Sequence, residues 1–227
     1  MVVGSNPATP TINIKMKIIL VSIFVLSSCS GFGLYITAVE NFNQFFKENK
    51  IDKEYAKSIP YASYLVSYQK SEYLLVLEKV NNNFLTWVDA ESNRLISLSD
   101  KMIKSHGLSN NFEIIQPPNL QEIVNRIEIE GNLFHNSYIT FTNPPTQHLK
   151  ISYKYKIERR NIEESNLVNY GSQTLFKVVE EFSVPTIKWK GYNYYLVNKD
   201  GLIIKSVQNL YPGYRLEFEK IRGYKAP

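Results

Sequence analysis

The chain has 227 residues, of which 44% are hydrophobic and 13% aromatic, and it contains a single cysteine. This composition is too apolar for a disordered chain, and the length is sufficient for one large domain. One cysteine excludes an internal disulfide and a cysteine-based zinc site, while a net charge of +5 spread along the chain does not by itself indicate a nucleic-acid-binding protein.

The amino-terminal segment has the layout of a secretory signal peptide. Lys15 and Lys17 precede the apolar run Ile18–Leu26, which is too short to span a bilayer. Leu26-Ser-Ser-Cys29 then resembles the lipobox of bacterial lipoproteins, in which the signal is cut before the cysteine and the cysteine receives a diacylglyceryl group and an acyl chain. We therefore expect lipidation at Cys29 rather than a buried cysteine at the end of a helix.

The lipobox divides the chain into four expected parts. Met16 fits the start of the signal better than Met1, so residues 1–15 are interpreted as a spurious extension and residues 16–28 as the lipoprotein signal peptide. Residues 29–50 form a lipid-anchored, partly helical segment, and residues 51–227 form a β-rich domain. Ser30 rather than aspartate follows Cys29, which by resemblance to bacterial lipoproteins suggests sorting to the outer membrane.

One or two short helices are expected before the β-rich domain. Apolar residues at three- and four-residue spacings from Tyr35 to Phe46 share one helical face and predict a helix over residues 35–49. Asp52 is the predicted N-cap of a second helix that ends at Ser58, just before Pro60.

After Pro60 the hydrophobic pattern has a period of two, which is typical of antiparallel sheets. The predicted strands cover residues 64–68, 72–80, 84–88, 94–98, 138–141, 151–158, 192–197, 202–207 and 214–219, with a hairpin turn at Asn198–Gly201. Leu120–Ile129 fits either a strand or a short helix. The fold class is therefore mainly β, with antiparallel sheets arranged as a sandwich or barrel.

No catalytic or metal-binding constellation emerges from the sequence, and we expect no cofactor. His106, His135 and His148 lie far from any second ligand at a suitable spacing and are interpreted as surface residues. The adjacent carboxylates Glu163-Glu164 and Glu180-Glu181 point to opposite sides of a strand and are interpreted as solvated surface charge, although a hydrolase that uses distant carboxylates stays open.

Aromatic residues provide the candidate ligand contacts. Trp87, Trp189, Tyr192 and Tyr194, with Tyr195, could stack on sugar rings, although core packing explains them as well. The segment Lys188–Tyr192 mixes basic and aromatic side chains as nucleic-acid-binding proteins do. Because the chain carries an export signal, an acidic polysaccharide is the better candidate partner and no nucleic-acid partner is expected.

Four segments in order resemble the YjbF/GfcB family of bacterial lipoproteins. They are Ile59-Pro-Tyr-Ala-Ser63, Phe84-Leu-Thr-Trp87, the basic segment Lys101–Leu108 that ends in Gly-Leu, and Tyr194–Pro212. Ser105-His106 before Gly107, and Tyr195 in place of a frequent tryptophan, depart from the family pattern.

The resemblance implies a β-rich periplasmic domain tethered to the outer membrane. It implies a non-enzymatic role in the secretion or assembly of a capsule or exopolysaccharide, with envelope proteins of the same operon as partners. The alternative is a polysaccharide-binding or polysaccharide-modifying envelope protein.

Overall fold

The computed structural model describes residues 50–167 and 171–224, with side chains except at residues 128 and 159–174. The expected start at Met16, the signal peptide, Cys29 and the helix over residues 35–49 lie outside the described residues.

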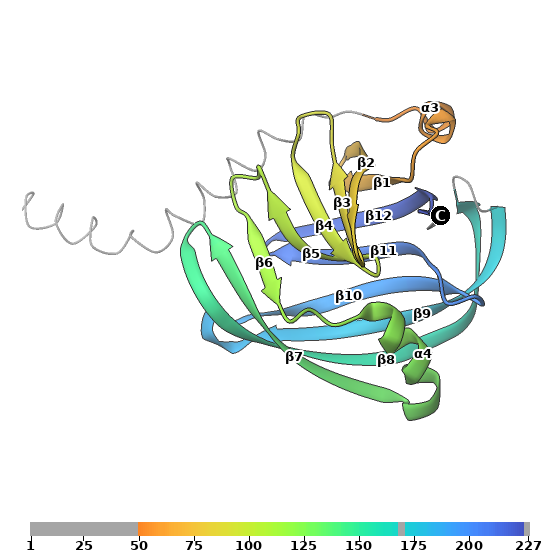
Figure 1. Ribbon diagram of the computed structural model, residues 1–227. Coiled ribbons are helices and arrows are strands. Elements are labelled where there is room, and N and C mark those ends of the chain that lie inside the picture. The colour runs from red at the N-terminus through yellow and green to blue at the C-terminus, as the bar shows by residue number, and fades with distance from the viewer. Residues whose placement is uncertain (1–49, 168–170, 225–227) are drawn as a thin grey trace, which may run out of the picture.

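Twelve antiparallel strands in this part of the chain close into one barrel (Figure 1). They are β1 (Ser63–Tyr68), β2 (Ser71–Asn81), β3 (Phe84–Val88), β4 (Arg94–Leu98), β5 (Lys101–His106), β6 (Phe112–Ile115), β7 (Asn132–Thr142), β8 (Pro145–Leu167), β9 (Gly171–Val184), β10 (Trp189–Asn198), β11 (Ile203–Tyr211) and β12 (Tyr214–Arg222). Each strand pairs with the next along the chain, and β1 pairs with β12 to complete the ring. The mainly β class is confirmed, and the structure is a barrel rather than a sandwich.

Two helices and one short 3-10 turn (Pro185–Ile187) accompany the barrel in the described residues. Helix α3 (Lys53–Ser58) starts as predicted, with the Asp52 side chain accepting a hydrogen bond from the Glu54 backbone N–H at 2.9 Å. The segment that fitted either a strand or a helix is helical and forms α4 (Leu120–Glu130). No described helix combines the length and the apolar character needed to cross a membrane.

Helix α4 packs its apolar side against the barrel and touches the β10–β11 hairpin. Leu120, Val124 and Ile127 on this helix are buried. Gly201 in the hairpin turn has a positive φ of 77°, and a Cβ there would lie 2.9 Å from Gln121 Nε2. Glycine at this position therefore permits both the turn and the close approach of the helix.

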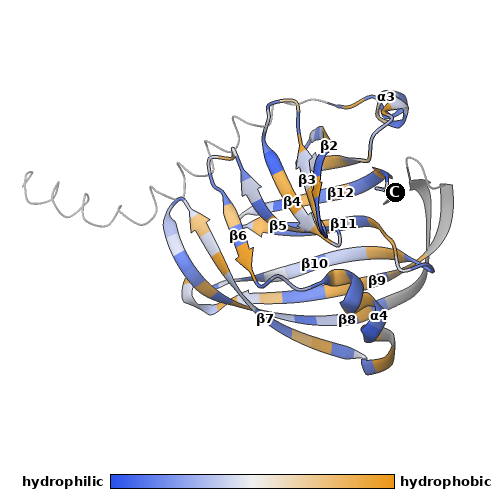
Figure 2. Cartoon of the chain, in the orientation of Figure 1, coloured by the Kyte–Doolittle hydropathy of each residue, from blue (hydrophilic) through white to orange (hydrophobic). Residues whose placement is uncertain are grey.

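Buried and accessible residues alternate along long strands such as β7 and β12. Figure 2 shows hydrophilic and hydrophobic residues following one another along the long strands. Large aromatic side chains meet in the interior: the Tyr64 ring lies edge-on to Trp87 at 4.6 Å and to Phe218 at 6.1 Å. These residues belong to β1, to its ring neighbour β12 and to β3, which lies beyond β2, so the contacts span four successive strands of the ring. Edge-to-face pairs stabilise such a core beyond the burial of their surface area.

Replacing Trp87 with alanine tests this core. Removing a fully buried tryptophan is expected to lower the free energy of unfolding by about 3–5 kcal/mol, through lost burial and a residual cavity. The measurement is urea unfolding followed by circular dichroism. Phe84→Ala is the matched control, because Phe84 lies on the same strand but is 40% exposed. Equal losses in the two variants would contradict the described core.

Candidate functional site

The predicted aromatic platform is divided by the wall of the barrel. Trp87 is 1% exposed, and its indole N–H donates to Ser97 Oγ at 2.8 Å. Because a sugar cannot reach a side chain inside the core, the prediction of a glycan contact is wrong for Trp87. A tryptophan at this place in the sequence is compatible with a position on the surface and with one in the core. Only the direction of its side chain, which the structure shows, distinguishes the two.

The three aromatic candidates on β10 lie on opposite faces of that strand. Trp189 packs edge-on against Phe182 at 4.7 Å and lines an interior cavity, whereas Tyr192 is 47% exposed on the outside. Tyr194 shares the outer face with Tyr192, but its ring already contacts the Lys177 ammonium at 4.2 Å. Trp189 therefore cannot stack on the same sugar as Tyr192 and Tyr194.

The described residues contain no cluster of side chains suited to hold a metal ion. His106 and His148 are exposed, in agreement with their interpretation as surface residues. His135 is half-buried, and its Nε2 lies 3.0 Å from the backbone carbonyl of Gln116.

The interior of the barrel holds an ion pair that the sequence did not reveal. Both carboxylate oxygens of Glu180 on β9 lie 2.6 Å from the Lys101 ammonium on β5, and these side chains are 0% and 2% exposed. The two residues are 79 positions apart in sequence. The interpretation of Glu180 as solvated surface charge is therefore wrong, while its neighbour Glu181 does point outward and is exposed.

Further polar groups complete the surroundings of this ion pair. The Asn193 side-chain amide donates to Glu180 Oε1 at 2.6 Å, and the Tyr195 hydroxyl donates to Oε2 at 3.5 Å. The Lys101 ammonium also lies 4.5 Å from the centre of the Tyr153 ring. A buried charge pair is tolerated when such contacts satisfy its remaining donors and acceptors.

Burial changes the proton affinities of this interior cluster. Desolvation lowers the pKa of Lys101, while the Glu180 carboxylate acts in the opposite direction. Desolvation raises the pKa of Tyr153 and Tyr195 well above the usual value, and the negative charge of Glu180 adds to this effect. Both phenols therefore stay protonated at any physiological pH, and neither serves as a base there.

Side chains also bridge the barrel between strands that are not neighbours in the ring. Gln208 on β11 accepts from the Met102 backbone N–H through Oε1 and donates to the Asp100 carbonyl through Nε2, both at 2.9 Å. Asp100 in turn accepts hydrogen bonds from the Tyr64 hydroxyl and from the Lys220 ammonium, the latter at 2.8 Å. These contacts tie the β4–β5 turn to β11, β12 and β1.

The space left beside the ion pair is very small. A cavity of about 10 Å³ is lined by Lys101, Tyr153, Trp189 and Asn193 together with apolar side chains. Such a volume accommodates about one water molecule. The interior cluster therefore serves to hold strands together, since a sugar or another organic substrate does not fit beside it.

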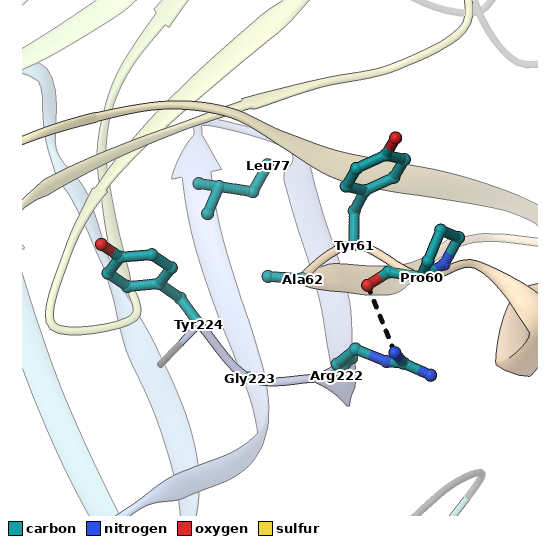
Figure 3. A pocket seen from close by; sticks show the side chains of 7 residues that line it. All are labelled: Pro60, Tyr61, Ala62, Leu77, Arg222, Gly223 and Tyr224. Atoms are coloured by element: carbon teal, nitrogen blue, oxygen red, sulfur yellow. Dashed lines mark hydrogen bonds between the residues drawn. The ribbon is translucent and has the colours of Figure 1, made fainter. Parts of the chain in front are cut away.

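An open pocket of about 710 Å³ lies at one end of the barrel (Figure 3). Its lining residues come from the segment before β1, from β2 and from the end of β12: Pro60, Tyr61, Ala62, Leu77, Arg222, Gly223 and Tyr224. Figure 3 shows the Tyr61 and Tyr224 rings on either side of Ala62 and Leu77. Tyr61 is 64% exposed and Tyr224 is 39% exposed, so both rings are accessible to a ligand.

Arg222 supplies a cation at the edge of this end pocket. Its guanidinium donates one hydrogen bond to the Pro60 carbonyl at 3.2 Å and keeps further donors for a ligand. Phenol rings stack on the apolar face of a sugar ring, and a guanidinium binds acidic substituents of the sugar. The pocket therefore combines groups that suit an acidic sugar. In the sequence, Tyr61 stands out only within a segment that resembles the family, and nothing there predicts the pocket. The other side of the pocket comes from residues about 160 positions further along the chain.

Comparison with known families matches residues 39–220 to the family described as YjbF, group 4 capsule polysaccharide lipoprotein gfcB. The match covers most of the chain, so the protein belongs to the YjbF family of capsule polysaccharide lipoproteins. The resemblance seen in the sequence is thereby confirmed.

The fold has a counterpart among solved structures. The crystal structure of the hypothetical lipoprotein YmcC from Escherichia coli (K12) superposes with a TM-score of 0.65 and 15% sequence identity, over 78% of this chain and 92% of that chain. At this identity the likeness concerns the fold. A comparison with curated proteins gives no match.

Replacing the two members of the interior ion pair singly and together tests its role. Glu180→Gln leaves the Lys101 charge buried without its counterion and is expected to cost about 3–5 kcal/mol of unfolding free energy. The double variant Lys101→Met/Glu180→Gln removes both charges and should recover most of this loss. Chemical denaturation measures both.

The exposed pair formed by Glu78 and Arg94 provides the control, since Glu78→Gln should leave the unfolding midpoint nearly unchanged. A double variant that is no more stable than Glu180→Gln alone would contradict the structural role of the ion pair.

Proposed function

We propose that this protein is an outer-membrane lipoprotein that faces the periplasm and takes part in the secretion or assembly of a capsule or exopolysaccharide without catalysing a reaction. The observation that carries the proposal is the family match over residues 39–220. The lipobox that ends at Cys29 supplies the anchor. Acyl chains on that cysteine would hold the domain at the membrane, because each buried methylene contributes about 0.8 kcal/mol.

The structure of the barrel supports a non-enzymatic role. The strongest charge cluster, Lys101 with Glu180, is buried in the interior, and each member neutralises the other. General acid–base chemistry needs a titratable group within hydrogen-bond reach of a substrate. A buried, mutually neutralised pair does not meet this requirement, so binding and positioning are the activities that we propose.

Deleting the gene in the native host tests the proposal. We expect extracellular polysaccharide to fall strongly, and we expect the wild-type gene to restore it. Cys29→Ser should fail to restore it, because an unlipidated protein is not retained at the membrane. The measurements are secreted polysaccharide per cell and the amount of the protein in separated outer membranes.

Ser30→Ala, next to the lipobox cysteine, is the matched control and should restore secretion. Unchanged polysaccharide in the deletion strain would overturn the proposed role, and a protein recovered in the inner membrane would overturn the proposed location.

The second candidate function, polysaccharide binding, is favoured by the end pocket. Its volume of about 710 Å³ is within the usual range for pockets that bind small ligands, about 300–1,000 Å³. Tyr61, Tyr224 and Arg222 offer stacking surfaces and a cation at the same place. The pocket would take a single sugar residue or a short segment of a polymer.

Removing the two aromatic walls tests the end pocket. Tyr61→Ala/Tyr224→Ala is expected to weaken retention on immobilised polysaccharide from the host by about tenfold, because each stacked ring contributes about 0.5–1.5 kcal/mol. Tyr55→Ala is the control, since Tyr55 is 56% exposed on α3 and does not line the pocket. Equal binding by both variants would exclude the pocket, and release of shortened polysaccharide by the wild type would indicate an enzyme instead.

A further inference from the structure

The outer faces of β7 and β8 carry aromatic and basic side chains in matching positions. Strand register places Phe134 opposite Lys154, Asn136 opposite Ser152, and Tyr138 opposite Lys150, with Lys156 one position beyond. We call these seven residues the β7–β8 strip: Phe134, Asn136, Tyr138, Lys150, Ser152, Lys154 and Lys156. The two strands lie side by side across the lower part of the view in Figure 1.

The strip is accessible to solvent although it contains large aromatic rings. Phe134 is 73% exposed and Tyr138 is 44% exposed. Lys154 lies 5.8 Å from the centre of the Phe134 ring, and the imidazole of His148 lies edge-on to Tyr138 at 6.4 Å. An exposed phenylalanine beside a lysine forms a surface on which an apolar sugar face and an acidic group can bind together.

The lysines of the strip keep their charge available. Lys150, Lys154 and Lys156 are exposed, and none forms an ion pair with a side chain in the part of the chain that the structure describes. Glu158, on the same face of β8, is already paired with Lys177 at 2.5 Å. Glu181 on β9 is in register with Lys154, so its carboxylate repels an anionic ligand at that one position. Because the strip has three lysines beside this one carboxylate, its charge is positive overall.

The spacing of these groups follows a line rather than a patch. Residues of one face repeat about every 6.7 Å along a strand, so the Phe134–Lys154 and Tyr138–Lys150 pairs lie about 13 Å apart. Between them, Asn136 Oδ1 accepts a hydrogen bond from Ser152 Oγ at 2.8 Å. The Asn136 amide and the Ser152 hydroxyl can also form hydrogen bonds with ligand hydroxyls. The strip thus has a polar pair at its centre and a pair of one lysine and one aromatic ring on either side of it.

We propose that the β7–β8 strip binds an extended anionic polysaccharide that lies along the two strands. The choice of polymer rests on the proposed function, whereas the surface itself rests on the register and exposure of the seven residues. Carboxylate-bearing sugars would pair with Lys150 and Lys154, and the faces of their rings would pack on Tyr138 and Phe134. A linear arrangement fits a polymer better than a lipid surface, which would contact a broad patch.

Binding by the full-length lipidated protein in neutral phosphatidylcholine nanodiscs tests the strip. The probes are alginate as a polyuronate, dextran as a neutral polymer, and phosphatidylglycerol vesicles as an anionic membrane. Wild-type protein should bind alginate more tightly than dextran, and added salt should weaken the binding. Lys150→Gln/Lys154→Gln/Lys156→Gln should weaken alginate binding about tenfold, since exposed charge pairs contribute modestly but act together here.

Lys53→Gln/Lys70→Gln/Lys79→Gln is the matched control, because it removes the same charge at exposed lysines outside the strip. It should change alginate binding by less than about twofold at physiological salt, where distant exposed charges are largely screened. Phe134→Ala/Tyr138→Ala should weaken binding about threefold or more, because stacking on both rings is lost. Circular dichroism verifies that each variant is folded.

Equal losses of alginate binding in the two lysine variants would overturn the proposal, as would wild-type binding to dextran that is as tight as binding to alginate. If the strip variant lost binding only to phosphatidylglycerol vesicles, the strip would be a membrane contact instead. Complementation separates this proposal from the proposed function. If the strip variants restore secretion fully in the deletion strain and bind alginate normally, the strip fails while the secretion role stands. If deletion leaves secretion unchanged but alginate binding depends on the strip, the secretion role fails while the strip stands.

Discussion

The neutralisation of charge inside the closed barrel is the constraint on which the rest of the structure depends. A lysine and a glutamate in a dry interior are tolerated only as partners, and Lys101 and Glu180 come from strands that are not neighbours in the ring. The ion pair therefore fixes the distance across the interior, while strand hydrogen bonds fix the order around it. Since the surrounding phenols and amides fill the remaining space, the wall of the barrel becomes the surface available to a partner.

A single turn provides the charges for two sides of the barrel. Ser99 and Asp100 both have positive φ angles, 48° and 66°, as a tight hairpin turn between β4 and β5 requires. Asp100 pairs with Lys220 on β12, and the next residue, Lys101, pairs with Glu180 on β9. Two adjacent residues of opposite charge thus connect the β4–β5 hairpin to two separate strands, β12 and β9.

Local patterns predicted nine of the twelve strands and the start of α3, whereas β5, β6, β9 and the long-range contacts were not predicted. The Asp52 cap and the turn at Asn198–Gly201 depend on neighbouring residues and were predicted correctly. Closure of the barrel depends on pairing between β1 and β12, which local alternation does not encode. Likewise, Glu180 was misread as solvated because its partner is 79 positions away. The end pocket was not predicted for the same reason, because its lining residues come from the segment before β1 and from the end of β12.

The filled interior has a consequence for the polymer binding that we propose. A hollow barrel could pass a chain through its centre and would then have to load it from a free end. In the part of the chain that the structure describes, the space beside the central ion pair holds about one water molecule, so a polymer strand does not fit past this pair. A polysaccharide bound as we propose would lie against the outside of the barrel, which it could reach at any point along its length. Under the proposed function, such side-on binding would need no free chain end, so the protein could hold a polymer while it is still being extended.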